Sequence, residues 1–401
     1  MPNSPAIDAL PPTSAQPGAT KKIIASALLA TIAPQGVWMM PLIVGSFAGR
    51  IEMSNSGAGL LASVALLGAC LMALAQALLY RLARQRMVTG ACLVALIVAY
   101  GGLMLTPSYG LGLLLMGILG LGMGGLLVIA MTAAAQTGKQ TQVIALGFVG
   151  QGALAAALAW AVSLVSETEA VTWLPLLLLG TAVAGLAAIP GIPNAPMAET
   201  RRIVDTDAPG LEAVGRWPLI LALAAWGLIN FSNGGFWPMI ERTAAADGFA
   251  NADISRAMSM TSMAGLVAAL GTLVIGRRFG LRWPIILTGL GTVVSIMAIV
   301  WTPTLPTFNG AMILFGLLWS VGPAYQLPVV AEADSAGSGM AWSILVMKAS
   351  MAVGPVIYGA LADYSGYVLA GVVSSIAAGV STLLFIAALL ASRRAQATAL
   401  Q

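Results

Sequence analysis

Apolar runs of twenty residues or more dominate this chain of 401 residues, and no other feature constrains its fold as strongly. Only 8% of the residues are charged, whereas a typical soluble domain has about 25%. A run of about twenty apolar residues crosses the hydrocarbon core of a bilayer as one helix. The shorter, alternating segments of a membrane β-barrel are absent from the sequence. The sequence therefore predicts an all-α polytopic membrane protein.

Twelve apolar segments can be counted, and a polar stretch separates the first six from the last six. The segments lie at 22–47, 57–80, 87–106, 109–135, 141–165, 171–190, 217–240, 254–276, 283–303, 308–331, 339–361 and 366–391. This count predicts five regions: a disordered cytoplasmic tail (1–20), a six-helix bundle (21–190), a cytoplasmic central loop (191–216), a second six-helix bundle (217–392) and a cytoplasmic tail (393–401).

Basic residues in the short loops set the expected orientation, because loops rich in Lys and Arg stay in the cytoplasm. With the amino terminus inside, Arg50, Arg242 and Arg256 fall outside and Lys348 lies within a span. The other fourteen of the eighteen basic residues are then cytoplasmic. We therefore expect a multi-pass protein of the plasma membrane, such as a bacterial inner membrane, with both termini in the cytoplasm.

The two halves carry similar short motifs at a nearly constant spacing. YRLARQR (80–86) and RRFGLRW (277–283) align at an offset of 197 residues, and GVWMMP (36–41) and GFWPMI (235–240) align at 199. Parallel repeats of six spans are typical of transporters built from two moving halves. With twelve spans, cytoplasmic termini and a polar central loop, the chain resembles the major facilitator superfamily.

The resemblance covers about residues 20–392 and implies two pseudo-symmetric six-helix bundles around a central cavity. The family's loop motif is degenerate here, because Tyr80 and Arg277 stand where the family has Asp. Basic residues of these loops can still cap helix ends and contact anionic lipid. Together with one arginine at the outer mouth, they are the candidate gating residues: Arg81, Arg84, Arg278 and Arg256.

The resemblance also implies that spans 1, 2, 4, 5, 7, 8, 10 and 11 line the cavity, and the amide side chains agree with this arrangement. Amides are costly in hydrocarbon, so they should face protein or water. The amides within spans lie on spans 1, 2, 4, 5, 7 and 10: Gln35, Gln76, Gln136, Gln142, Gln151, Asn230, Asn233 and Gln326.

Lys348 is the single formal charge deep inside a span, about nine residues or 14 Å from the cytoplasmic end of span 11. Its side chain is too short to reach the headgroups from that depth, and a buried ammonium needs compensation. No Asp or Glu of the sequence falls at the same depth. The lysine therefore either binds an anionic substrate or joins two helices through carbonyls and amides.

Other polar and aromatic residues could share the site with Lys348. The repeat offset of 197 carries Lys348 onto Gln151, which could close on a substrate from the opposite half or make an interhelical hydrogen bond. The candidate substrate contacts are Lys348, Gln151, Gln35, Asn233, Asn230, Tyr325, Gln326 and Trp319.

Several kinds of site are not expected. With no histidine and no ligand spacing around Cys70 and Cys92, the sequence predicts no metal site. The glycine-rich stretch GILGLGMGG (117–125) lies inside an apolar run, so we expect it to pack helices and not to hold phosphate. We expect no enzyme, no cofactor and no nucleic-acid partner.

The sequence leaves two functions open. The first is a secondary transporter that moves a small organic anion, a carboxylate, by alternating access, with Lys348 as the counter-charge. The second is an exporter of drugs or amphiphilic compounds coupled to protons, which the apolar spans and twenty methionines would suit. Either would work as a monomer among membrane lipids, and the first could use proton symport or exchange with a counter-substrate.

Overall fold

The computed structural model describes residues 19–79, 84–105, 108–137, 139–195, 216–276, 278–301, 304–334 and 339–399. Arg81, most of the expected tail over 1–20 and most of the central loop over 191–216 lie outside these residues. The described part of the expected tail over 393–401 is helical, because the last helix continues to Ala399.

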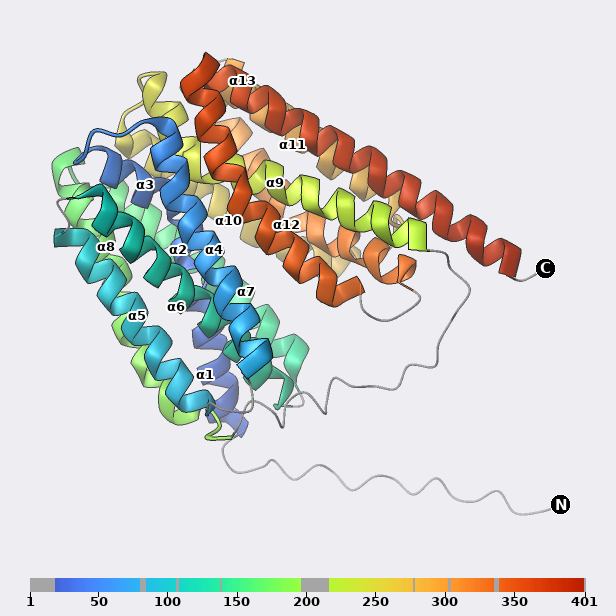
Figure 1. The fold of residues 1–401 in the computed structure, drawn as a ribbon, viewed down its shortest axis with the longest axis horizontal. Coiled ribbons are helices and arrows are strands. Elements are labelled where there is room, and N and C mark those ends of the chain that lie inside the picture. Colours follow the sequence, from blue (N-terminus) through green and yellow to red (C-terminus); the bar gives the residue numbers. More distant parts are fainter. Residues whose placement is uncertain are drawn as a thin grey trace.

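Helices make up both halves of the chain (Figure 1). The first half contains α1 (Ala19–Ile32), α2 (Gln35–Trp38), α3 (Met40–Ala48), α4 (Asn55–Leu79), α5 (Gln85–Leu105), α6 (Tyr109–Ala135), α7 (Gln140–Ser163), α8 (Glu167–Gly185) and the 3-10 helix η1 (Leu186–Gly191). The second contains α9 (Arg216–Ala246), α10 (Asn251–Ile275), α11 (Arg282–Trp301), α12 (Leu305–Ala333) and α13 (Gly339–Ala399).

Eleven of the twelve predicted spans correspond to helices that are long and apolar enough to cross a membrane, and α10 lies at the position of the other one. By length and composition, nine helices of the described chain could cross a membrane, and the bent α1–α3 makes a tenth span. α13 counts once among the nine but holds two spans, because its backbone leaves helical geometry at Ser365 and Gly366. α10 is about 37 Å long at 1.5 Å per residue. It is long enough to cross a membrane but less apolar than the eleven spans counted above, because it carries Asp253, Arg256 and several hydroxyl side chains.

The first span differs from the single helix expected over 22–47. It bends by 42° between Trp38 and Met40, four residues beyond Pro34, which precedes α2. A proline cannot donate its backbone nitrogen to the helical hydrogen-bond ladder, and a second one, Pro41, begins α3. Two prolines within eight residues therefore break this span near its middle.

Glycines let the helices inside each bundle touch, as expected for the stretch 117–125. A Cβ at Gly120 of α6 would overlap the carbonyl of Ala65 on α4. In the second bundle, a Cβ at Gly316 of α12 would overlap the carbonyl of Thr261 on α10. Both residues of the second pair lie 196 positions after those of the first. The two halves are therefore repeats in their packing as well as in their sequence.

We expect Gly120→Leu to destabilise the first bundle. The new side chain would push against the backbone of α4, which cannot move aside as a side chain can, and overpacking typically costs about 1–3 kcal/mol. The temperature of unfolding in detergent, followed by tryptophan fluorescence, should fall by several degrees. Gly101→Leu on α5 is the matched control, because nothing lies near a Cβ there. Equal melting of both variants would contradict the contact.

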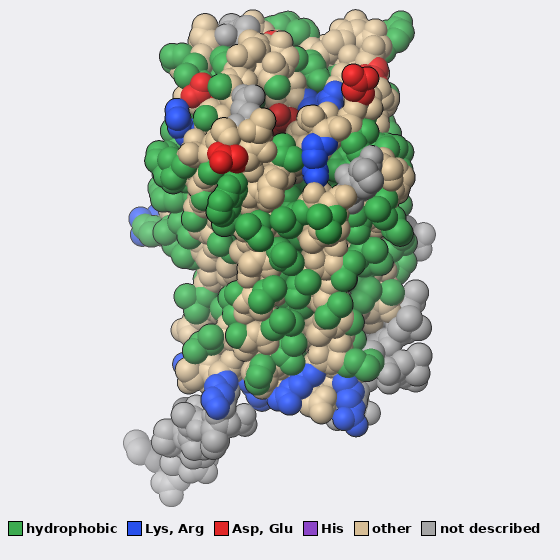
Figure 2. All heavy atoms as spheres, turned by 90° about the vertical axis from the view of Figure 1, so that its left-hand side faces the viewer, with side chains coloured by type: hydrophobic (Ala, Val, Ile, Leu, Met, Phe, Trp, Pro, Cys, Tyr) green, Lys and Arg blue, Asp and Glu red, His purple; other side chains and the backbone are tan. Residues whose placement is uncertain are grey.

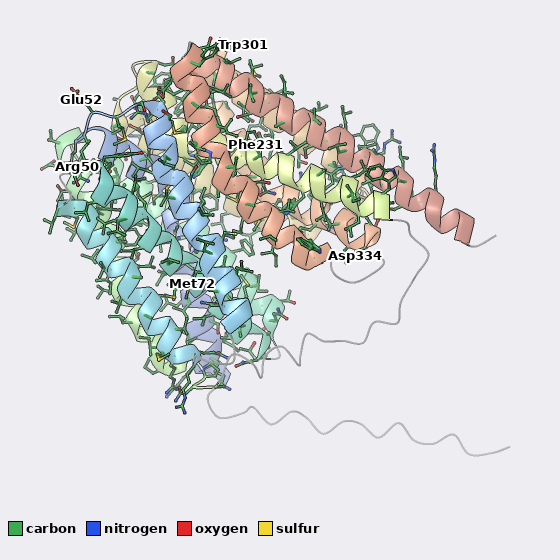
Figure 3. All side chains as sticks on the ribbon, in the orientation of Figure 1. Arg50, Glu52, Met72, Phe231, Trp301 and Asp334 are labelled. Atoms are coloured by element: carbon green, nitrogen blue, oxygen red, sulfur yellow. The ribbon has the colours of Figure 1, made fainter. Side chains whose placement is uncertain are left out.

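The two bundles lean together at the top of Figure 1 and diverge toward the bottom. We call the upper end, with Arg50, Glu52 and Trp301 in Figure 3, the outer end, following the orientation expected from the sequence. Met72 and Asp334 lie toward the opposite, inner end. Figure 2 shows a belt of hydrophobic side chains between the two ends, with Lys and Arg at the inner end and both acidic and basic side chains at the outer end.

Candidate functional site

α4 and the first span of α13 pack against each other along the seam between the bundles. Asn55 of α4 meets Gly359 of α13 near the outer end. Further inward, Leu66 packs against Ala352. The residue numbers rise along α4 as they fall along α13, so the two helices are antiparallel. This register fixes what each helix presents to the other at greater depth.

Lys348 lies on this seam. It is one helical turn inward of Ala352 and on the same face of α13, since residues four apart share a face. Cys70, four residues after Leu66 on the same face of α4, lies opposite Lys348. The Lys348 side chain is half-buried, and it makes no hydrogen bond or ion pair within the described chain. The ammonium therefore faces the other bundle with no protein counter-charge.

An aromatic cluster lies one turn outward of Lys348 and joins the bundles. Trp38 of α2 stacks on Trp319 of α12, with ring centroids 6.0 Å apart and planes at 24°. Trp38 also meets Trp237 of α9 edge-on at 6.2 Å, and the Trp237 indole N–H donates to the carbonyl of Val37 at 2.9 Å. Trp38 and Trp237 occupy the same place in the two aligned motifs. The repeat thus brings its two copies of this tryptophan into contact.

Gln35 and Gln151 are joined beside this cluster. Gln35 is fully buried, and its Nε2 donates to the carbonyls of Thr31 at 2.9 Å and Gln151 at 3.1 Å. The Oε1 atom of Gln35 is buried with no partner in the described structure. The Gln151 side chain is buried too, and no hydrogen bond between it and Lys348 is present in this conformation.

Four of the candidate substrate contacts line one small cavity inside the second bundle. The cavity measures about 20 Å³, room for about one water molecule. Asn230, Asn233, Trp319 and Gln326 lie around it, between α9, α11 and α12. Asn230 donates to the carbonyl of Trp226 at 2.8 Å. The Oδ1 atom of Asn233 is buried without a partner among the described residues, so it can still accept a hydrogen bond.

Tyr325 lies apart from this group. Its hydroxyl donates to the carbonyl of Gly276 at 2.8 Å, and Gly276 ends α10 with a φ of 55°. Glycine adopts a positive φ of this kind without steric cost because it has no Cβ. The hydroxyl of Tyr325 is therefore engaged in holding the inner end of α10, whereas its neighbour Gln326 reaches the small cavity.

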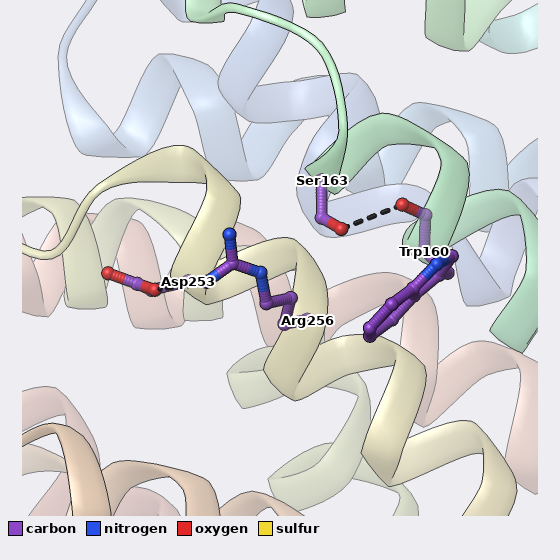
Figure 4. A network of polar contacts seen from close by, with 4 residues as sticks. All are labelled: Trp160, Ser163, Asp253 and Arg256. Carbon is purple, nitrogen blue, oxygen red and sulfur yellow. Dashed lines mark hydrogen bonds and ion pairs between the residues drawn. The ribbon is translucent and has the colours of Figure 1, made fainter.

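The three candidate gating arginines that the structure describes lie at the two surfaces of the molecule. Arg84 and Arg278 are exposed at the inner end. Arg256 pairs with Asp253 at 3.1 Å on the first turns of α10. Figure 4 shows this pair beside the outer end of α7, where Ser163 donates to the carbonyl of Trp160. None of these arginines lies near Lys348.

A polar cluster at the outer end joins the bundles. None of its residues is among the candidate site residues selected from the sequence. Asp363 of α13 accepts hydrogen bonds at 2.8 Å from the backbone N–H groups of Asn55 and Ser56, and at 2.6 Å from the Ser56 hydroxyl. Arg242 and Tyr367 donate to the Asn55 side chain at 2.9 and 2.6 Å. We call these five residues the outer latch. A carboxylate of one bundle thus caps the first turn of a helix in the other.

The other side of the outer end is packed less tightly. A cavity of about 190 Å³ lies there between α3, α8, α9 and α10. Gly45 of the first bundle and Glu241 of the second both line it and touch each other, since a Cβ at Gly45 would overlap the Glu241 carboxylate. α9 continues through Glu241 to Ala246, whereas the sequence predicted an end at residue 240. This cavity contains none of the candidate substrate contacts.

We expect Asp363→Asn to weaken closure of the outer end. The amide keeps the shape of the side chain but loses the charge that favours the N-terminus of α4. A cap of this kind contributes about 1 kcal/mol, so the ratio of open to closed outer ends should rise about fivefold. Labelling of Cys70 from the inner side by an impermeant maleimide measures this ratio. Cys70 lies inward of the seam contacts, so its labelling slows as the outer end opens and the inner end closes. Glu52→Gln, an exposed carboxylate at the same end, should leave labelling unchanged.

No protein-family model matches the sequence, and no curated protein matches it by sequence. Solved structures do match the fold. A crystal structure of a variant of the nucleoside transporter NupG has a TM-score of 0.70 at 14% identity and covers 93% of this chain and 99% of that one. A bacterial homologue of the human lysosomal transporter Spinster gives 0.66 at 13%, covering 95% and 98%. The human organic anion transporter MFSD10 gives 0.62 at 16%, covering 93% and 100%. The chain therefore has the major facilitator fold.

Proposed function

We propose that this protein is a secondary transporter that carries a small organic anion across the membrane by alternating access, with Lys348 as the counter-charge for the substrate. The observation that carries the proposal is the position of Lys348: half-buried, on the seam between the bundles, and without a partner in the described chain. An isolated charge at this depth is costly, and an anion that entered from the inner end would reduce the cost.

Alternating access is supported by the unequal contacts of the two ends. The outer latch and the Trp237–Val37 hydrogen bond hold the bundles together outward of Lys348, while the bundles diverge inward of it (Figure 1). In a transporter of two moving halves, a central site between them opens to one side at a time. In this conformation, Lys348 would be reached from the cytoplasm.

Exchange of one anion for another follows from the same charge. An empty carrier would have to close around an uncompensated ammonium, whereas a loaded carrier closes around a neutral pair. We therefore expect exchange to be faster than net flow. The structural neighbours do not indicate one substrate class, since one is a nucleoside transporter and another an organic anion transporter.

Counterflow into proteoliposomes tests the proposal. Purified protein is reconstituted with an unlabelled carboxylate inside, and uptake of labelled mono- and dicarboxylates is compared with protein-free liposomes at pH 8, where simple diffusion of the acids is slowest. Protein-dependent uptake of a carboxylate is the expected result. Uptake of lipophilic cations without carboxylates would overturn the proposal and favour an exporter of amphiphilic compounds.

A further inference from the structure

The charges and apolar surfaces around Lys348 narrow the class of anion, and the inference below rests on the proposed function. The number of cations that can face the substrate limits its charge. The faces next to the ammonium limit the shape and polarity of the rest of the molecule.

Lys348 is the single cation at its depth in the described chain. The arginines at the outer end already have partners. Arg50 donates to the carbonyls of Leu103 and Met104 at 2.7 and 3.0 Å, while Arg242 belongs to the outer latch and Arg256 pairs with Asp253. A substrate with two carboxylates would therefore bring one negative charge without compensation into a site of low polarity, which is costly. One ammonium suits one carboxylate.

The surface outward of the ammonium is apolar and partly aromatic. Leu66, Met351 and Ala352 form a small buried cluster one turn away, and the partly exposed Trp319 and Met347 pack on it. Trp319 is half-buried and its ring stacks on Trp38. Flat rings pack well on such faces, and methionines adapt to them because their side chains are flexible and polarisable.

We propose that the substrate is a monocarboxylate with a flat apolar body, such as an aromatic ring, whose carboxylate pairs with Lys348 while its body packs on the Trp319 and methionine surface. A short hydrophilic acid would satisfy the ammonium but would not cover the partly exposed side chains of Trp319 and Met347. A dicarboxylate would cover no more of it and would bring a second charge.

Four acids that differ in two properties test the proposal by isothermal titration calorimetry on the purified full chain. Benzoate and acetate carry one carboxylate, with and without a ring. Terephthalate and succinate carry two, again with and without a ring. We expect benzoate to bind at least about tenfold more tightly than each of the other three. Trp319→Leu should reduce the preference for benzoate over acetate severalfold, while Trp301→Leu, at the outer end of α11, should not change it.

Each other result overturns part of the inference. Equal or tighter binding of terephthalate would show that the site accepts two charges. Equal binding of acetate and benzoate would remove the role of the apolar surface. Tight binding of succinate alone would leave the proposed transport of organic anions intact but contradict this substrate class. Binding of none of the four, together with no carboxylate counterflow, would overturn the proposed function as well.

Discussion

Replacing Lys348 with glutamine should abolish carboxylate counterflow. The amide is similar in length but brings no charge, so a substrate carboxylate would enter the seam unpaired. Removing one partner of a buried, charged pair typically costs about 2–5 kcal/mol, which corresponds to a loss of affinity of at least about thirtyfold. Lys348→Arg keeps the charge and should retain measurable transport with a weaker affinity, because the guanidinium is larger and planar.

The same variants separate this reading from a purely structural lysine. If Lys348 only joined helices, Lys348→Gln would lower the temperature of unfolding and leave the affinity of the remaining folded protein unchanged. On our proposal the reverse holds: the variant melts at or above the wild-type temperature, because an uncompensated charge has been removed from the seam. Arg282→Gln is the matched control, since this arginine is exposed at the start of α11 and belongs to none of the proposed sites. Counterflow by Lys348→Gln at the wild-type rate would contradict the proposal.

Gly59→Leu should lock the outer end open and stop transport. A Cβ at Gly59 of α4 would overlap the carbonyl of Pro355 on α13, and both atoms belong to helix backbones that cannot yield separately. The contact lies between the bundles and not within one of them, so each bundle should still fold. The expected protein is stable and binds substrate from the outer side but does not complete the cycle.

The natural cysteines make it possible to measure whether the inner end is open. Cys70 is partly exposed and Cys92 is buried, so Cys70 should dominate labelling by an impermeant maleimide from the inner side. When the outer end is held open, the inner end closes and labelling of Cys70 should slow at least tenfold in Gly59→Leu. Gly101→Leu should label as the wild type does, because space is open there. A Gly59→Leu protein that transports normally would show that the outer end need not close.

The sequence predicted most of the spans because their hydrophobic length determines them. It predicted less well where a span ends. α9 was expected to end at residue 240, yet it continues to Ala246 and carries Arg242 toward Asn55 of the other bundle. In a sequence, polar residues at the end of a span predict a loop. Here a partner on a distant helix, Asn55 for Arg242, accompanies the continued helix.

The candidate site residues were selected from the sequence by one criterion, polarity inside an apolar run, and this criterion has a limited reach. Polarity inside an apolar run was enough to select Asn230, Asn233 and Gln326, which the structure gathers around one cavity. The same criterion also selected Tyr325, whose hydroxyl binds Gly276 elsewhere. Asp363 was passed over because it lies at a helix end, where a charge is ordinary. Its role depends on the N-terminus of α4 some three hundred residues away in sequence.

The two sets of close glycine contacts have a genetic consequence. Those within a bundle, as at Gly120 and Gly316, hold parts that must stay together throughout the cycle. Those between bundles, as at Gly59 and Gly359, form contacts that must separate in each cycle. A screen of random glycine substitutions should therefore yield two phenotypes: inactive variants missing from the membrane, and inactive variants present at normal abundance. Only the second kind should be recoverable by suppressor mutations on the facing helix of the other half.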